Sequence, residues 1–177
     1  SSLCLMVLLI GVLLYGDWRL SQTFTVGQPV PIAVVQGAIE QKLRWQPEYR
    51  RANLDRYLAL TRGAAATHPL LIFWPEYAVD FHVQLDSPLR ESVFQLTRDL
   101  EADLVLGGQY YNYGEADVEF YNSVFLVHRG RLAGRYDKTL LLPFAEANQV
   151  ESLFPGIPNR YVPGQSIHLF RTPVARI

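Results

Sequence analysis

The sequence predicts an α/β domain with a mixed β-sheet, preceded by an apolar N-terminal helix. Three observations lead to this prediction. Short apolar runs alternate with segments of helical periodicity, two further apolar segments flank a tight turn, and an uncharged run stands at the start of the chain. Alternating strands and helices are typical of α/β folds, and a closing hairpin adds antiparallel strands to the sheet.

The composition fits one globular domain and excludes several classes of protein. Of 177 residues, 49% are hydrophobic and 19% are charged, which excludes a disordered tail or a low-complexity linker. Sixteen basic and seventeen acidic residues give a formal net charge of −1, so no overall positive field would attract nucleic acid. The single cysteine, Cys4, excludes an internal disulfide framework and a cysteine-built zinc site.

The apolar start is the first element. The run from Leu3 to Tyr15 carries no charge, although a full bilayer crossing needs about 20 apolar residues. We interpret residues 1–16 as the end of a transmembrane helix and residues 17–30 as a linker, and the whole chain as a piece of a longer protein. Trp18 stands between two charged residues, as is typical of a membrane interface. A signal peptide and a buried core helix are the alternatives.

The predicted domain then covers residues 31–177. Its buried strands are expected at the apolar runs 32–36, 70–74 and 104–108, and the continuous run at 70–74 predicts a strand that is covered on both faces. Between them lie two helical segments. Pro47 suits the first position of a helix that extends to about residue 61.

The second helix begins at Ser87 and Pro88. Serine is a favoured N-cap residue, and proline is favoured at the first helical position. Both helices carry apolar residues at the i, i+3, i+4 spacing of one helical face. These residues are Leu54, Tyr57 and Leu58 in the first helix and Leu89, Val93, Leu96 and Leu100 in the second.

The last third of the chain predicts a hairpin and a long loop. Apolar residues at 120–128 and 132–136 flank the turn sequence Arg129-Gly130-Arg131. A Pro- and Gly-rich loop follows at about 143–165, and residues 167–170 predict a further short strand.

Glu76 is the first candidate catalytic residue. It closes the Trp74-Pro75-Glu76 motif at the end of the most apolar strand. Functional sites of α/β folds lie at the carboxyl ends of strands, and a carboxylate placed there is suited to general-base chemistry. The alternative is a surface glutamate in the turn after the strand.

Lys138 and Glu146 are the other candidates. Lys138 ends the second hairpin strand, where its ammonium group is suited to stabilising an oxyanion or pairing with Glu76. Glu146 lies eight residues further on, and a second carboxylate near a lysine can tune a site or orient a substrate amine. The alternatives are a solvated edge-strand lysine and a loop glutamate.

Other ligand-binding motifs are absent from the sequence. The Gly107-Gly108 pair follows a strand but lacks the spacing of a dinucleotide-binding loop, so we expect no cofactor. Cys4 lies in the apolar run and is interpreted as an inert apolar residue. The histidines stand far apart and predict no metal site; they are His68, His82, His128 and His168.

Taken together, the motifs resemble the nitrilase superfamily of carbon–nitrogen hydrolases, and within it the apolipoprotein N-acyltransferases of bacterial membranes. The resemblance covers most of residues 30–172. It rests on an ordered series: VQG with Trp45 downstream, IFWPEYAV, LGGQYYN, FYNSVFLVHRGRLAGRYDKTLLLPFAE and the VPGQ loop. It implies a nitrilase-like α-β-β-α sandwich, of which this chain would hold a part.

The resemblance also implies site residues. Such enzymes use a glutamate, a lysine and a cysteine, and the motifs place the first two at Glu76 and Lys138. Glu146 matches a further functional glutamate of the family. The cysteine would follow a strand that begins at about Ala175, so we expect it beyond Ile177 and expect the chain alone to be inactive.

Three positions depart from the family pattern. Tyr77 stands where the family usually has serine or threonine. Ala145 and Ala147 flank Glu146 where glycine and tyrosine are usual. These departures concern the substrate preference of the site more than the type of reaction.

The activity that the resemblance implies is transfer of a fatty acyl chain through a cysteine thioester. The donor would be a phospholipid, and the acceptor would be the amine of the N-terminal diacylglyceryl-cysteine of a bacterial apolipoprotein. The protein would lie in the bacterial inner membrane with its catalytic domain on the periplasmic side. Two alternatives stay open: a membrane-tethered amidase or nitrilase-type hydrolase, and a catalytically dead nitrilase-fold binding domain.

Overall fold

The computed structural model describes the chain except residues 1, 23–26, 86, 115–116, 144–145 and 147–160. Its α-helices are α1 (Ser2–Ser21), α2 (Gln41–Arg44), α3 (Arg50–Ala64) and α4 (Pro88–Leu100), with 3-10 turns at Pro47–Tyr49 and Ala65–Thr67. Its strands are β1 (Ile32–Val34), β2 (Leu71–Phe73), β3 (Asp103–Tyr113), β4 (Val118–His128) and β5 (Arg131–Asp137).

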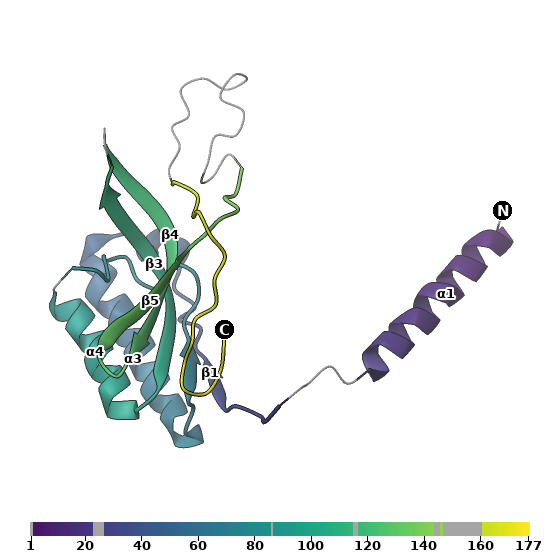
Figure 1. Ribbon diagram of the computed structural model, residues 1–177, viewed down its shortest axis with the longest axis horizontal. Helices are drawn as coiled ribbons and strands as arrows, with labels where there is room; N and C mark the ends of the chain where they lie inside the picture. Colours follow the sequence, from purple (N-terminus) through teal and green to yellow (C-terminus); the bar gives the residue numbers. More distant parts are fainter. Residues whose placement is uncertain (1, 23–26, 86, 115–116, 144–145, 147–160) are drawn as a thin grey trace.

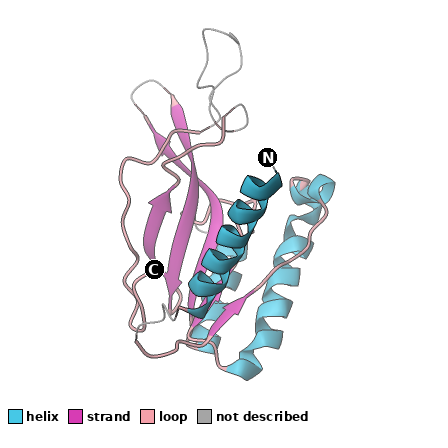
Figure 2. Ribbon diagram, turned by 90° about the vertical axis from the view of Figure 1, so that its right-hand side faces the viewer, coloured by secondary structure: helices cyan, strands magenta, loops and turns pink. Residues whose placement is uncertain are grey.

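The five strands form one mixed sheet in the order β1-β2-β3-β4-β5. The first three run parallel, and β3, β4 and β5 pair in antiparallel fashion. Both α3 and α4 lie on the same side of this sheet (Figure 1, Figure 2). The structure therefore confirms the predicted α/β class and its mixed sheet. Because β5 runs in the same direction as β2, the carboxyl ends of these two strands point the same way.

The main core lies between the helices and the sheet. The helical faces predicted from the i, i+3, i+4 spacing are the faces that pack inward, and burying each large apolar side chain contributes roughly 1.5–3 kcal/mol relative to exposure. Ser87 accepts a hydrogen bond at its Oγ from the Arg90 amide, 3.1 Å away, which confirms the predicted N-cap of α4. The core includes Leu54, Tyr57, Leu58, Ile72, Val93, Phe94, Leu96, Leu104, Leu106, Phe125 and Val127.

The first strand differs from the prediction of a fully buried run. Ala33 and Val35 face the core, but the residues Ile32 and Val34 are 54% and 75% exposed. The reason is topological, because β1 is the edge strand of the sheet and the helices cover only one face. The second strand, β2, lies inside the sheet and is buried at the adjacent residues Leu71 and Ile72, as its continuous apolar run predicted.

The hairpin β4–β5 forms as predicted. Arg129 and Gly130 adopt φ values of 44° and 78°, the left-handed pair that two-residue hairpin turns require. The preceding strand β3 is longer than expected, because it continues past the two glycines to Tyr113 as the antiparallel partner of β4.

The strand predicted at 167–170 does not form. The residues Ile167 and Leu169 are 82% and 63% exposed. Phe170 packs against Val105 and Leu126 of the sheet in a small apolar cluster. The chain then turns back on itself, so that Arg171 bridges Arg176. Most of the predicted loop at 143–165 lies outside the described residues.

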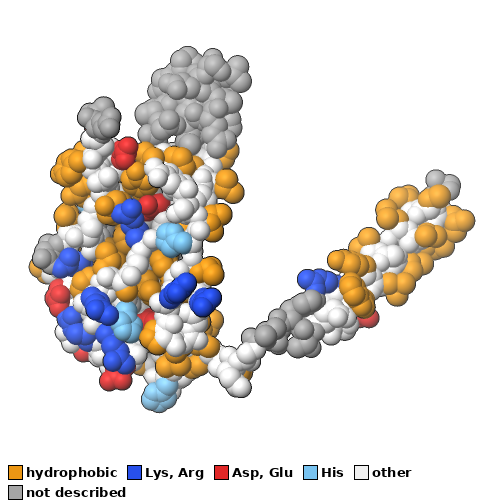
Figure 3. All heavy atoms as spheres, in the orientation of Figure 1, with side chains coloured by type: hydrophobic (Ala, Val, Ile, Leu, Met, Phe, Trp, Pro, Cys, Tyr) orange, Lys and Arg blue, Asp and Glu red, His pale blue; other side chains and the backbone are white. Residues whose placement is uncertain are grey.

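The N-terminal helix α1 has no buried residue and stands apart from the sheet (Figure 1). Its 20 residues are long and apolar enough to cross a membrane, judged by length and composition. Apolar side chains cover the visible side of the helix (Figure 3). The helix continues past residue 16, where the sequence placed the start of the linker, and ends at Ser21.

Candidate active site

Glu76 stands at the elbow where the chain leaves β2 and crosses over β3. Gly107 makes this crossing possible, because a Cβ at this position would lie 2.6 Å from the Cα of Glu76 and 2.7 Å from the carbonyl oxygen of Pro75. The Ala78 amide then donates to the Gly107 carbonyl at 3.0 Å. Trp74, just before the elbow, is anchored in the core, because its indole N–H donates to the buried Thr61 hydroxyl of α3 at 3.0 Å. The crossing brings the carboxylate of Glu76 from β2 to β4.

Lys138 directly follows β5 and is held by its backbone. Its amide donates to the Asn122 carbonyl on β4, and its carbonyl accepts from the Gly164 amide, each at 2.9 Å. A Cβ at Gly164 would lie 2.2 Å from the Asp137 carbonyl oxygen, so only glycine allows this approach. This close approach explains why the VPGQ motif has a glycine, Gly164, at its third position.

The three candidate residues meet in one cluster. The Lys138 ammonium nitrogen lies 2.8 Å from Glu146 Oε2 and 3.3 Å from Glu76 Oε1. The side-chain amide of Asn122 donates to Glu76 Oε1 at 2.5 Å and to Glu146 Oε1 at 2.7 Å. The structure thus brings together all three residues that the sequence singled out, and Asn122 links the two carboxylates.

The two carboxylates have different surroundings. Glu146 is buried and uses both oxygens, since Oε2 also accepts from the Leu142 amide at 2.8 Å. The side chain of Glu76 is 59% exposed, and both contacts that the structure gives it involve Oε1. Among the described residues, no hydrogen bond or ion pair is formed by its second oxygen, Oε2. An open carboxylate suits proton transfer, whereas a fully engaged one suits a fixed electrostatic role.

Lys138 and Glu146 stabilise each other's charged forms. The hydrogen bond from Lys138 to Glu146 is the main reason that the pKa of Lys138 lies above its ordinary value, since burial alone would lower it. Burial alone would raise the pKa of Glu146, but hydrogen bonds from the Leu142 amide, Lys138 and Asn122 together lower it. At neutral pH the site therefore holds an ammonium group between carboxylates, with N–H groups that can stabilise a developing oxyanion.

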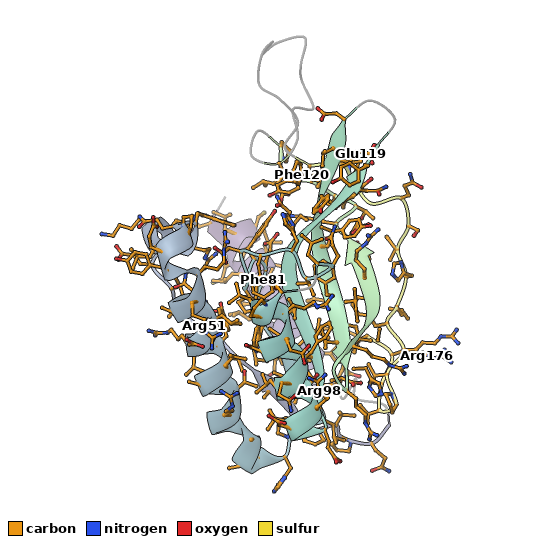
Figure 4. All side chains as sticks on the ribbon, turned by 90° about the vertical axis from the view of Figure 1, so that its left-hand side faces the viewer. Arg51, Phe81, Arg98, Glu119, Phe120 and Arg176 are labelled. Atoms are coloured by element: carbon orange, nitrogen blue, oxygen red, sulfur yellow. The ribbon has the colours of Figure 1, made fainter. Side chains whose placement is uncertain are left out.

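A pocket of about 730 Å³ opens beside this cluster. Glu76, Lys138 and Glu146 line it, together with polar residues from the start of α3 and from the segment after β2. Phe120 lines it from β4, and Figure 4 shows this residue beside Glu119, near the start of the strand. The aromatic and aliphatic lining consists of Trp45, Tyr77, Val79, Phe81, Phe120, Leu142 and Tyr161.

Tyr77, the first departure from the family pattern, forms part of this lining. Its backbone has a φ of 51°, a left-handed conformation in the turn that follows Glu76. The ring packs edge-on against Trp45 at 5.3 Å and lies 6.1 Å from Tyr161, measured between ring centroids. Burial raises the pKa of Tyr77, so its phenol stays neutral. Ala145 and Ala147 lie outside the described residues.

Two features of the site were not assigned from the sequence. Asn122 is buried in β4, and a buried amide signals a required hydrogen-bond partner. Gly107 was considered only as part of a nucleotide-binding motif, although a glycine inside a strand also marks a close backbone approach. Within the described part of the chain, no group of three histidine, cysteine or acidic side chains is placed to hold a metal ion.

Comparisons with known proteins concern the family and the fold of the chain. A family model described as carbon–nitrogen hydrolase matches residues 31–177. Among solved structures, an amidase from Nesterenkonia sp. has a similar fold, with a TM-score of 0.53 and 17% sequence identity over 86% of this chain and 55% of that one. Its identity to this chain is low, so this likeness concerns the fold alone.

Curated relatives carry the name apolipoprotein N-acyltransferase. The protein from Geobacter metallireducens is 32% identical over 93% of this chain and 32% of its own length. That from Pseudomonas paraeruginosa is 31% identical over 85% of this chain and 30% of its own length. A Brucella suis relative is 29% identical over 81% of this chain. The chain thus spans about a third of the length of the curated relatives it matches.

Proposed function

Because this chain belongs to the carbon–nitrogen hydrolase family, we propose that its parent protein is a membrane-bound N-acyltransferase that uses Glu76 and Lys138 in acyl transfer. The donor is a phospholipid, and the acceptor is the amine of the diacylglyceryl-cysteine at the N-terminus of an apolipoprotein. The names of the curated relatives support this choice of reaction. The apolar helix α1 and the apolar lining of the pocket suit substrates that reside in a bilayer.

The mechanism begins with a cysteine that we place beyond Ile177. The carboxylate of Glu76 accepts the thiol proton through Oε2, and the thiolate attacks the ester carbonyl of the donor. Lys138 keeps one N–H for the oxyanion while its other N–H groups point to the two carboxylates. When the tetrahedral intermediate collapses, the lysophospholipid oxygen leaves with the proton from Glu76, and a thioester remains.

The second half-reaction uses the same groups. The acceptor amine attacks the thioester carbonyl, Glu76 takes the amine proton, and Lys138 again faces the oxyanion. Collapse releases the amide product, and the thiol regains its proton from Glu76. Glu146 and Asn122 touch Glu76 or Lys138 and keep these two groups in place. We further propose that the catalytic domain lies on the periplasmic side of the inner membrane.

The observation that carries this proposal is the position of the Lys138 ammonium, 3.3 Å from Glu76 Oε1 and 2.8 Å from Glu146 Oε2, on the wall of a pocket that also has aromatic and aliphatic lining. The test uses the full-length parent with a phospholipid and a synthetic diacylglyceryl-cysteine peptide. Mass spectrometry should find a third acyl chain in amide linkage on the peptide. Release of free fatty acid without acylated peptide would instead assign a hydrolase, and recovery of both substrates unchanged would assign a binding domain.

A further inference from the structure

The pocket carries a second charged group on a wall that the proposed mechanism does not use. Arg50, the first residue of α3, donates from Nε to Oδ2 of Asp80 at 3.0 Å. Both residues line the pocket that also contains Glu76 and Lys138. Their side chains are 40% and 10% exposed, so the carboxylate is nearly buried while the arginine side chain is partly exposed.

This ion pair differs in kind from other arginine pairs of the described chain. Arg51 pairs with Asp55 one helical turn away on the exposed surface of α3, and Arg98 pairs with Glu91 within α4. The residues Arg50 and Asp80 are 30 positions apart and join two separate elements at the pocket. A pair that connects α3 to the segment after β2 fixes the guanidinium at one place on the pocket wall.

The geometry leaves most of the guanidinium available. An arginine has five N–H donors in a planar fork, and within the described residues Asp80 is the one partner that the structure gives to Arg50, through Nε. The fork formed by the two terminal nitrogens matches two oxygens of a phosphate group. A carboxylate that holds Nε preorganises this fork, so little side-chain entropy is lost on binding.

We propose that Arg50, held by Asp80, binds the phosphodiester of the acyl donor. This inference rests on the proposed function and assigns the headgroup end of the same substrate. In a glycerophospholipid only the glycerol backbone separates the reacting ester from the phosphate, so one pocket can receive both. Asp80 neutralises the charge of Arg50, and the cluster of Glu76, Glu146 and Lys138 sums to one negative charge. A singly charged diester therefore suits the pocket better than a free phosphate dianion.

The experiment measures binding, so that it does not depend on acyl transfer. The full-length parent in detergent micelles is titrated with a diether phospholipid, which has no ester to react, and with the diether glycerol of the same chain length. The variants are Arg50→Gln and the matched control Arg51→Gln, whose arginine lies on the outer side of α3 (Figure 4). Arg50→Lys serves as a second variant, since it keeps the charge beside Asp80 but lacks the planar fork.

The expected result is a loss of about tenfold in affinity for the diether phospholipid in Arg50→Gln, which corresponds to about 1.4 kcal/mol. Arg50→Lys should lose part of that affinity, Arg51→Gln should lose none, and the diether glycerol should bind all variants equally. Inorganic phosphate should not displace the lipid from the wild type. Equal losses for both lipids, no loss in Arg50→Gln, or displacement by inorganic phosphate would each overturn the proposal. If binding follows the expected pattern while no acyl transfer occurs, the proposed function fails and the phosphodiester site remains.

Discussion

Gly107 of β3 lies directly against the backbone of Glu76, where the chain that leaves β2 crosses over β3. A Cβ atom on Gly107 would lie only 2.6 Å from the Cα of Glu76. This contact decides whether the carboxylate of Glu76 reaches Asn122 on the next strand. The position of the proposed general base therefore depends on a residue that has no functional group of its own.

Replacing Gly107 with alanine should destabilise the domain, because the new Cβ would push against the backbone of Pro75 and Glu76 rather than a flexible side chain. We expect the free energy of unfolding to fall by about 1–3 kcal/mol in denaturant titrations. Gly63→Ala is the control, since nothing lies within 4 Å of its added Cβ in α3, and it should leave stability unchanged or raise it. Equal stability of Gly107→Ala and the wild type would mean that the elbow does not cross β3 closely.

Asn122 should stabilise the fold through the carboxylates that it joins. Asn122→Ala removes the donor to Glu76 and Glu146, and we expect a loss of about 1–3 kcal/mol at neutral pH. The loss should shrink in acid, because the hydrogen bond from Asn122 helps to lower the pKa of Glu146 and therefore stabilises its charged form. The control is Asn112→Ala, an exposed position on β3. A loss that is the same at pH 3 and pH 7 would indicate simple repacking of the strand.

The pH dependence of stability should report on Lys138 and Glu146. The pKa of Glu146 is lowered below its ordinary 4.5, so its contribution is present above that pH and is lost as pH falls through the folded-state pKa. The pKa of Lys138 is raised above 10.5, so its contribution is present below that pH and is lost as pH rises through the folded-state pKa.

These directions predict that the contribution of Lys138 and Glu146 to the free energy of unfolding is constant between about pH 5 and pH 10. The difference in unfolding free energy between the wild type and Lys138→Met should be constant across this range and should shrink below about pH 4.5. Circular dichroism of chemical denaturation at several pH values measures it. A difference that grows on acidification would contradict the ion pair between Lys138 and Glu146.

The helix α1 should anchor the protein in a bilayer. An arginine at the centre of a membrane helix costs about 2.5–3.5 kcal/mol on insertion scales. Leu9→Arg should therefore lower the fraction of protein that stays with membranes after alkaline carbonate extraction, whereas Leu9→Ala should not. If Leu9→Arg were retained like the wild type, α1 would not be the anchor.

Local signals in the sequence predicted much of the fold. The Ser87-Pro88 start of α4, the helical spacing in α3 and the turn at Arg129 and Gly130 depend on neighbouring residues, and all three are confirmed. The wrong prediction, a strand at 167–170, also came from local apolar character. The exposure of Ile167 and Leu169 shows that apolar residues alone do not select a strand when no neighbouring strand pairs with them.

The site depended on contacts that no local pattern reveals. Glu76, Lys138 and Glu146 were named from strand ends and from the family resemblance, and the structure brings them together. Asn122 and the pair of Arg50 with Asp80 were not assigned, because their partners are far apart in the sequence. Such pairs become visible only when the crossing over Gly107 and the packing of α3 are known.

The central claim is that Glu76 and Lys138 activate a cysteine for attack on a phospholipid ester. The most direct measurement is the intact mass of the full-length parent after incubation with phospholipid, before any acceptor is added. We predict a gain of one acyl chain that hydroxylamine removes, and a decrease of roughly 10²–10⁴-fold in its rate of formation in Glu76→Gln and Lys138→Ala. Acylation of Lys138→Ala at the wild-type rate, or no acylation of the wild type, would contradict the account.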